Sequence, residues 1–236
     1  MTRAENRRHD QLRPVEILVD YLEQPLGSAL YSQGKTRVLC TASLDDGVPR
    51  WLRDSGRGWL TAEYSLLPAS TGERTQREAS AGRQKGRTVE IQRLIGRALR
   101  AVLDFEALGE RTLWMDCDVL QADGGTRCAA ISGAYVAAAR ALGKAGLSRA
   151  LPESVAAVSL GIVDGELLLD LDYVEDSGAE VDLNVVITGA ERLVEVQATA
   201  ERAPFDREAL DELLDLGAAG IAKICSAQET ALDAVV

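Results

Sequence analysis

The sequence predicts an α+β protein made of two similar halves, each of which runs from strands into a helix. Two observations lead to this prediction. Runs of strand-like residues precede the helical segments, and the apolar residues change from alternation to helical spacing at Arg87. The full order is several strands, helix, strand, helix, several strands, helix, and no clear sequence repeat accompanies it. A chain of 236 residues can form one large domain or two small ones.

The first half opens with strand-like runs bounded by Gly, Asp or Pro turn signals. These runs cover Val15–Val19, Ser28–Tyr31, Thr36–Leu44 and Gly58–Tyr64. The stretch from Pro68 to Gly86 is polar, contains glycine and has no apolar period. It predicts a long exposed loop, and long loops inside compact domains are often functional.

A helix is predicted from Arg87 onward. The residues at helical spacing are Ile91, Leu94, Ile95, Ala98, Leu99 and Val102. Arg93, Arg97 and Arg100 fall on the opposite face, which we expect to meet solvent. At about 100° per residue, Arg87 lies within roughly 40° of the centre of the apolar stripe if the helix begins there. A guanidinium that points inward needs an anion or a carboxylate.

The second half begins with a strand, a tight turn and an alanine-rich helix. The strand is Arg111–Gln121, the turn ends at Gly125, and the helix is Thr126–Lys144, whose small residues suit close packing on a sheet. Asp206 is a suitable N-cap for a final helix that reaches about Leu232. Strands are predicted between these helices at Val155–Val163, Leu167–Leu171, Val181–Ile187 and Leu193–Ala198.

Composition excludes several classes of chemistry. The chain has one histidine, His9, so catalysis by a histidine base or a histidine-ligated metal has almost no source. Its four cysteines are scattered without a CxxC pair, which indicates packing thiols instead of a zinc site or disulfides. No window reaches the roughly 18 apolar residues of a membrane helix, and residues 2–10 are charged. We therefore expect a cytoplasmic protein without a membrane partner.

Charge is divided unevenly along the chain. Residues 1–100 carry 17 Lys and Arg against 12 Asp and Glu, a net +5, whereas residues 101–236 carry 9 against 25, a net −16; together these give −11. The segment Arg74–Arg100 alone holds eight basic residues. Such segregation is typical of a local anion-binding surface on an acidic protein, although a solvated helix face also produces it.

The turn Asp123–Arg127 is the sharpest local feature. Gly124 and Gly125 let the backbone approach a ligand closely, and the helix that follows presents free amides beside Thr126 and Arg127. Amides, a hydroxyl and a guanidinium together bind phosphate. The segment is neither a Walker loop nor a GxGxxG fingerprint. An ordinary glycine turn with a threonine at the helix start is the alternative interpretation.

A second feature is the acidic segment 173–184. Because Val181 and Leu183 share one face of a strand, Asp182 and Asn184 share the other. Asp176 lies six residues before Asp182 in a predicted turn. The two carboxylates can converge to bind a divalent cation or to act as an acid. Alternatively, Asp176 caps the turn and Asp182 marks a strand edge.

Together these segments resemble the bacterial ribonuclease PH family over nearly the whole chain. The matching stretches are Arg13–Val15, Arg37–Ser43, Gly47–Arg50, Gly58–Tyr64, Gly86–Ile95, Asp116–Arg127 and Asp176–Asn184. The resemblance implies a ribonuclease PH-like fold with mixed sheets, a single domain spanning residues 1–236, and a hexameric ring built as a trimer of dimers. It also implies phosphorolysis, in which phosphate attacks the last phosphodiester of an RNA 3′ end and releases a nucleoside 5′-diphosphate.

The resemblance carries roles onto particular residues. Inorganic phosphate, the co-substrate, is expected at Arg87 with Gly125, Thr126 and Arg127. Asp182 is expected to act as a general acid for the leaving 3′-oxygen. Asp176 is expected to support it, and the two carboxylates are the expected ligands of Mg²⁺.

The same resemblance implies that RNA, as tRNA precursors, contacts the basic loop. Arg74 and Arg77 match the tRNA-binding arginines of the family, whereas Ala69 stands where relatives often carry an arginine. Two other classes of function remain open from the sequence. One is a non-catalytic ring subunit like those of exosome cores, and the other is a hydrolytic nuclease that uses Mg²⁺ at the two aspartates.

Overall fold

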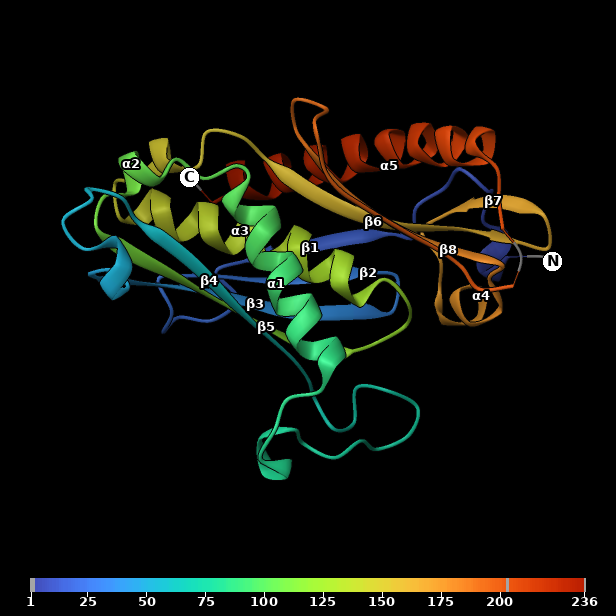
Figure 1. Cartoon of the computed structure of the whole chain (residues 1–236), viewed down its shortest axis with the longest axis horizontal. Helices are drawn as coiled ribbons and strands as arrows, with labels where there is room; N and C mark the ends of the chain where they lie inside the picture. Colours follow the sequence, from blue (N-terminus) through green and yellow to red (C-terminus); the bar gives the residue numbers. More distant parts are fainter. Residues whose placement is uncertain (1–2, 203, 236) are drawn as a thin grey trace.

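The computed structural model describes residues 3–202 and 204–235. It contains two β-sheets with helix α3 (Thr126–Lys144) between them, because α3 packs on strands of both sheets (Figure 1). The predicted α+β architecture of two β-then-α halves is confirmed. None of the helices in these two ranges is long and apolar enough to cross a membrane.

The first sheet has five strands in the order β1-β2-β3-β5-β4. All neighbours are antiparallel except β4 and β5, which run parallel, so the sheet is mixed. Helix α1 (Gly86–Arg100) joins these two strands and packs on β4. The strands are β1 (Val15–Val19), β2 (Gly27–Gln33), β3 (Thr36–Asp46), β4 (Trp59–Leu66) and β5 (Arg111–Gln121).

The second sheet has four strands in the order β7-β6-β8-β9 and is antiparallel throughout. The last helix, α5 (Arg207–Asp233), packs on β6 and β7 and also on β1, so it bridges both sheets (Figure 1). Asp206 caps it as predicted, by accepting a hydrogen bond from the amide of Ala209. The strands are β6 (Val155–Val163), β7 (Glu166–Leu169), β8 (Val181–Thr188) and β9 (Leu193–Ala200).

Small residues let α3 approach the first sheet closely. A Cβ on Gly133 would lie 2.8 Å from both the Cys40 sulfur and the Tyr31 Cβ, and both of these side chains are fully buried. Contacts this close leave no room for a methyl group in a core packed at crystal density. The predicted close packing of a small-residue helix on a sheet is therefore confirmed, and it fixes where the helix N-terminus lies.

Two predictions about local structure were wrong. Asp176 lies in a short helix, α4 (Tyr173–Gly178), instead of a turn, because Asp172 and Glu175 form a capping box that nucleates it. Arg100 is not a solvent-facing residue: its guanidinium stacks 4.9 Å from the centre of the Trp59 ring and donates a 3.0 Å hydrogen bond to the Leu60 carbonyl. A second short helix, α2 (Phe105–Leu108), precedes β5.

Candidate active site

A cavity of about 50 Å³ brings together residues from both halves of the chain. Six of them are the residues singled out from the sequence for phosphate or carboxylate chemistry. They come from the first turns of α1 and α3, from α4 and from β8, so the site forms only when the two sheets are packed together. The lining residues are Arg87, Gly125, Thr126, Arg127, Asp176 and Asp182, with Ser159 and Asn184 in addition.

Two left-handed glycines shape the turn that enters α3. Gly124 and Gly125 have φ values of 75° and 63°, a region that other residues adopt at a cost in free energy. A Cβ on Gly124 would lie 2.5 Å from the Leu171 carbonyl. Gly125 is the N-cap residue and makes no side-chain cap, so the first amides of a 19-residue helix stay available for an anion.

The Thr126 hydroxyl is oriented from behind. The buried Tyr64 donates a 2.9 Å hydrogen bond from its phenol oxygen to Thr126 Oγ1. Burial raises the pKa of Tyr64, which keeps the phenol protonated and therefore a donor. Because the threonine oxygen accepts this bond, its own proton is available to a ligand in the cavity.

Arg127 is held by side chains of the second sheet and of α1. Its Nη1 donates a 2.6 Å hydrogen bond to Gln197 Oε1 and lies 3.7 Å from Glu90 Oε1. Gln197 in turn donates to Glu90 across 3.0 Å. These partners order the guanidinium before any ligand arrives. Gln197 and Glu90 lie 107 residues apart in the sequence, so no local pattern predicts that they contact Arg127.

Arg87 lines the cavity, but the prediction that it is an inward-facing residue of the helix was wrong about burial. The residue is exposed, and its neighbour Thr88 takes the buried position of the first turn, where it donates a 2.9 Å hydrogen bond to Glu78. The apolar stripe of α1 begins one turn later, at Ile91. At the first turn the helix faces the polar cavity, so Arg87 forms part of its rim.

Asp176 and Asp182 converge on the same cavity, as predicted. Burial raises the pKa of Asp182, and the charge of Asp176 raises it further. Asp176 is exposed as a residue, yet partial desolvation of its carboxyl at the cavity wall raises its pKa despite the opposing charges of Arg87 and Arg127. Two carboxyl groups in one cavity, one of which raises the pKa of the other, can hold a proton for transfer or share a cation.

Asn184 was singled out only for sharing a face with Asp182. Its Nδ2 lies 3.3 Å from Asp182 Oδ1, and its Oδ1 accepts a hydrogen bond from Cys128 Sγ, also at 3.3 Å. Both ends of the amide are therefore in use, and Asn184 orients the Asp182 carboxyl.

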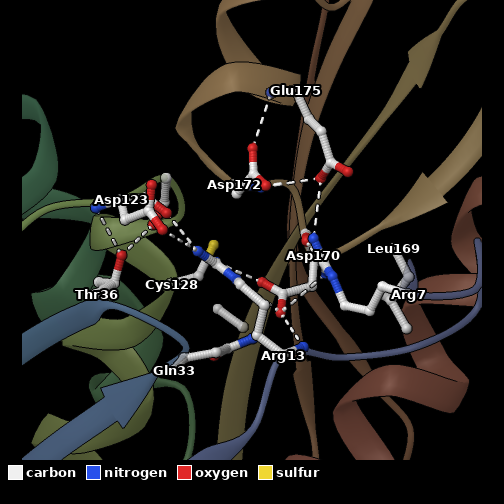
Figure 2. A network of polar contacts seen from close by, with 12 residues as sticks. Arg7, Arg13, Gln33, Thr36, Asp123, Cys128, Leu169, Asp170, Asp172 and Glu175 are labelled. Carbon is white, nitrogen blue, oxygen red and sulfur yellow. Dashed lines mark hydrogen bonds and ion pairs between the residues drawn. The ribbon is translucent and has the colours of Figure 1, made fainter. Parts of the chain in front are cut away.

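A buried network of arginines and carboxylates lies beside the turn and contacts it through Arg13 (Figure 2). Arg13 donates to Asp170 from its backbone amide and from Nη2, both at 2.7 Å, and also donates to the Asp123 carbonyl. A Cβ on Gly125 would lie 3.3 Å from Arg13 Nη2, so a positive charge lies directly behind the turn Gly124–Arg127. Although burial opposes it, the charge of Asp170 raises the pKa of Arg13.

The same network fixes α4, the helix that carries Asp176. Arg3 Nε and Arg7 Nη2 donate to Glu175 at 2.7 and 3.0 Å, and all three side chains are buried. The sequence indicated only a charged N-terminal segment, because partners that lie 172 and 168 residues apart leave no local signal.

Arg74 and Arg77 are not part of this cavity. Both are exposed on the segment between β4 and α1, which projects from the body of the protein at the bottom of Figure 1. Arg77 lines a separate cavity of about 750 Å³ between this loop and the first sheet, with Asp116 and Asp118 on its other side. The predicted long loop is confirmed, and a short 3₁₀ turn at Ala79–Ala81 interrupts it.

Comparison with protein families agrees with this arrangement. The model of the 3′ exoribonuclease family, domain 1, matches residues 11–142, and domain 2 of the same family matches residues 153–220. The chain belongs to the 3′ exoribonuclease family. Both matched segments contribute to the cavity, the first through Arg87 and the turn Gly125–Arg127 and the second through the two aspartates.

Individual members of the 3′ exoribonuclease family are similar over nearly the full length. Ribonuclease PH of Frankia casuarinae is 58% identical over 232 residues, covering 98% of this chain and 94% of the relative. Ribonuclease PH of Bacillus subtilis is 53% identical over 236 residues, covering 98% and 96%. The resemblance to ribonuclease PH is confirmed.

Solved structures share the fold at low identity. The crystal structure of rice (Oryza sativa) Rrp46 superposes with a TM-score of 0.81 at 21% identity, covering 98% of this chain and 100% of that chain. A chain of the Archaeoglobus fulgidus exosome with RNA bound to the active site gives a TM-score of 0.78 at 23% identity, covering 95% and 91%. The ribonuclease PH-like fold is therefore confirmed.

Proposed function

We propose that this protein is a phosphate-dependent 3′→5′ exoribonuclease that removes 3′-terminal nucleotides from RNA as nucleoside 5′-diphosphates. It is thus a nucleotidyltransferase that uses phosphate as the acceptor. One observation carries the proposal. The cavity places an anion-binding helix N-terminus and two arginines beside two carboxylates with raised pKa values. Full-length similarity to ribonuclease PH of several organisms supports the same reaction.

Phosphate binds where the structure offers donors without internal partners. The free amides after Gly125 and the Thr126 hydroxyl hold it, and Arg127 and Arg87 neutralise its charge. No activated side chain is required, because phosphate itself is the nucleophile. The protein's task is to position two anions against each other and to screen their repulsion.

Asp182 assists the leaving group. A phosphate oxygen forms a bond to the phosphorus of the terminal nucleotide as the bond from that phosphorus to the 3′-oxygen of the shortened RNA breaks. Asp182 donates a proton to this oxygen, and its raised pKa favours the protonated form that the step needs. Asn184 keeps the carboxyl in place.

The donor set also fits Mg²⁺. Two carboxylates that line one polar cavity are hard oxygen donors of the kind that Mg²⁺ prefers. Asp176 and Asp182 would hold the ion. It would supply further charge neutralisation for the reacting phosphates. The described part of the chain contains no cluster of three or more His, Cys, Asp or Glu side chains suited to a metal, so the remaining ligands would come from substrate and water.

RNA contacts the projecting loop through Arg74 and Arg77, and tRNA precursors are the proposed substrates. We further propose a homohexameric ring, a trimer of dimers, in the cytoplasm. A ring would bring several basic loops together on a chain of net charge −11. The loss of an arginine at Ala69 removes one expected RNA contact.

One experiment separates this function from its two rivals. The protein is incubated with a short RNA in the presence and absence of inorganic phosphate, and the products are resolved by chromatography. Phosphate-dependent release of nucleoside diphosphates is the expected result. Nucleoside monophosphates would instead identify a hydrolytic nuclease, and RNA binding without products would identify a non-catalytic ring subunit.

A further inference from the structure

Ser159 lines the same cavity as Thr126 and Asp182. It lies on β6, and only 4% of its surface is exposed. Its Oγ is buried and has no hydrogen-bond partner within residues 3–202 and 204–235. A buried hydroxyl without a partner is unfavourable and rare in folded proteins.

The surroundings of Ser159 place its hydroxyl directly beneath the phosphate turn. A Cβ built on the left-handed Gly125 would lie 3.4 Å from Ser159 Oγ. Opposite Ser159 in the β6–β8 register is Asn184, whose amide is already used by Asp182 and Cys128. The Ser159 carbonyl accepts a 2.7 Å hydrogen bond from the Asp170 amide, which fixes the backbone of the strand here.

Ser132 is a nearby serine whose hydroxyl, unlike that of Ser159, has a hydrogen-bond partner within the protein. Ser132 of α3 is fully buried, and its Oγ accepts a 3.2 Å hydrogen bond from the amide of Ala157, two residues before Ser159 on β6. Two other donors of the cavity also have supporting partners: Thr126 has Tyr64, and Arg127 has Gln197. Ser159 alone among these hydroxyls faces the cavity with its hydrogen-bonding capacity unused by the described residues.

We propose that Ser159 is a further phosphate ligand, which donates a hydrogen bond from Oγ to an oxygen of the inorganic phosphate seated on the turn Gly124–Arg127. The inference rests on the proposed function, since it assigns a role within the same site. Ser159 approaches from the sheet, whereas Arg87 and Arg127 approach from two helices, so its contribution is directional as well as electrostatic. A bound phosphate oxygen would provide the hydrogen-bond acceptor that the described residues do not offer to this hydroxyl.

The test is a Ser159→Ala variant of the full-length protein, with Ser132→Ala as the matched control. Phosphate affinity is measured without RNA, from the rise in Tm as inorganic phosphate is added, and the KM for phosphate is measured from diphosphate release. We expect Ser159→Ala to weaken phosphate binding and to raise the KM for phosphate, each by about tenfold to a hundredfold, the range for a hydrogen bond to a charged group. The kcat at saturating phosphate should change much less.

Stability provides an independent readout. Ser159→Ala removes no internal hydrogen bond, so its Tm without phosphate should equal or exceed that of the unmodified protein. Ser132→Ala loses the bond from Ala157, so its Tm should fall while its phosphate affinity stays the same.

A Ser159→Ala protein that binds phosphate as tightly as the unmodified protein would overturn the proposal. If its phosphate-free Tm also fell to match Ser132→Ala, the role of Ser159 would be structural. Failure of the proposed function would look different: the unmodified protein would release no diphosphates, while the binding measurement would still decide the role of Ser159.

Discussion

Replacing Asp182 by asparagine separates acid catalysis from substrate binding. The change keeps the size of the side chain and removes the proton that the leaving 3′-oxygen needs. General acid catalysis contributes about 10²–10⁴ in rate, so kcat should fall by that factor, equivalent to roughly 3–5 kcal/mol of transition-state stabilisation. The turn Gly124–Arg127 and the loop that carries Arg74 and Arg77 are untouched. The Kd for RNA and the phosphate affinity should therefore stay close to their original values.

The same substitution should stabilise the folded protein. The pKa of Asp182 is raised in the folded state, first by burial and then by Asp176. A raised carboxyl pKa means that ionisation near neutral pH opposes folding, and the opposition is relieved as pH falls through the raised value. Asparagine removes this charge. The Asp182→Asn protein should therefore have a higher Tm at neutral pH than the unmodified protein, although its kcat is lower.

Asp118 supplies the matched control. It is another half-buried aspartate, on β5, whose pKa is raised by burial and by a neighbouring aspartate, Asp116, and it lies outside the phosphate cavity. Asp118→Asn should also raise the Tm but leave kcat unchanged. Turnover is followed as diphosphate release from a labelled RNA, and RNA binding by fluorescence anisotropy. If Asp182→Asn retained turnover while RNA binding weakened, the acid assignment would be wrong.

Three further predictions concern the remaining supports of the site. Arg87→Ala should raise the KM for phosphate sharply, whereas Arg93→Ala on the same helix should not; a normal phosphate dependence in the Arg87 variant would contradict the proposed contact between Arg87 and phosphate. Tyr64→Phe removes the bond to Thr126 and should raise the KM for phosphate by about fivefold, the value of one hydrogen bond; equal KM values would mean that the threonine needs no orientation. Glu175→Gln should lower the free energy of unfolding by about 3–5 kcal/mol in urea titrations at pH 7, because it leaves two buried arginines short of a carboxylate. Although burial opposes it, the pairing with these arginines lowers the pKa of Glu175, so its contribution is present above the carboxyl's unfolded pKa and is lost as pH falls through the lowered value. The loss caused by the variant should therefore shrink in acid, and an equal loss at all pH values would refute this account.

Local sequence patterns predicted the elements that depend on local physics. The strand Arg111–Gln121 and the helix Thr126–Lys144 begin and end where predicted, because glycines and the alternation of burial mark their ends. The α4 helix was missed although its signal was present: Asp172 and Glu175 are spaced as a capping box, which was overlooked beside the Ser177–Gly178 pair.

Contacts between distant segments could not be predicted in this way. The pairing of Arg13 with Asp170 spans 157 residues and depends on how the two sheets pack, not on any local pattern. The burial of Arg87 could not be predicted from its angle to the apolar stripe of α1. That angle does not reveal whether the apolar core or a polar cavity lies opposite the first turn of the helix. Ser159 sits in a continuous buried strand, where a single serine among apolar residues gives no hint of its environment.

The division of the cavity between the two halves has a consequence for the making of the protein. During synthesis the turn Gly124–Arg127 leaves the ribosome about 50 residues before Asp176 and Asp182, and helix α5, which packs on the second sheet, follows these aspartates in the chain. A nascent chain can therefore form this turn before either carboxylate has been made. The cavity is thus completed only after the second sheet has been made and has packed against the first half of the fold.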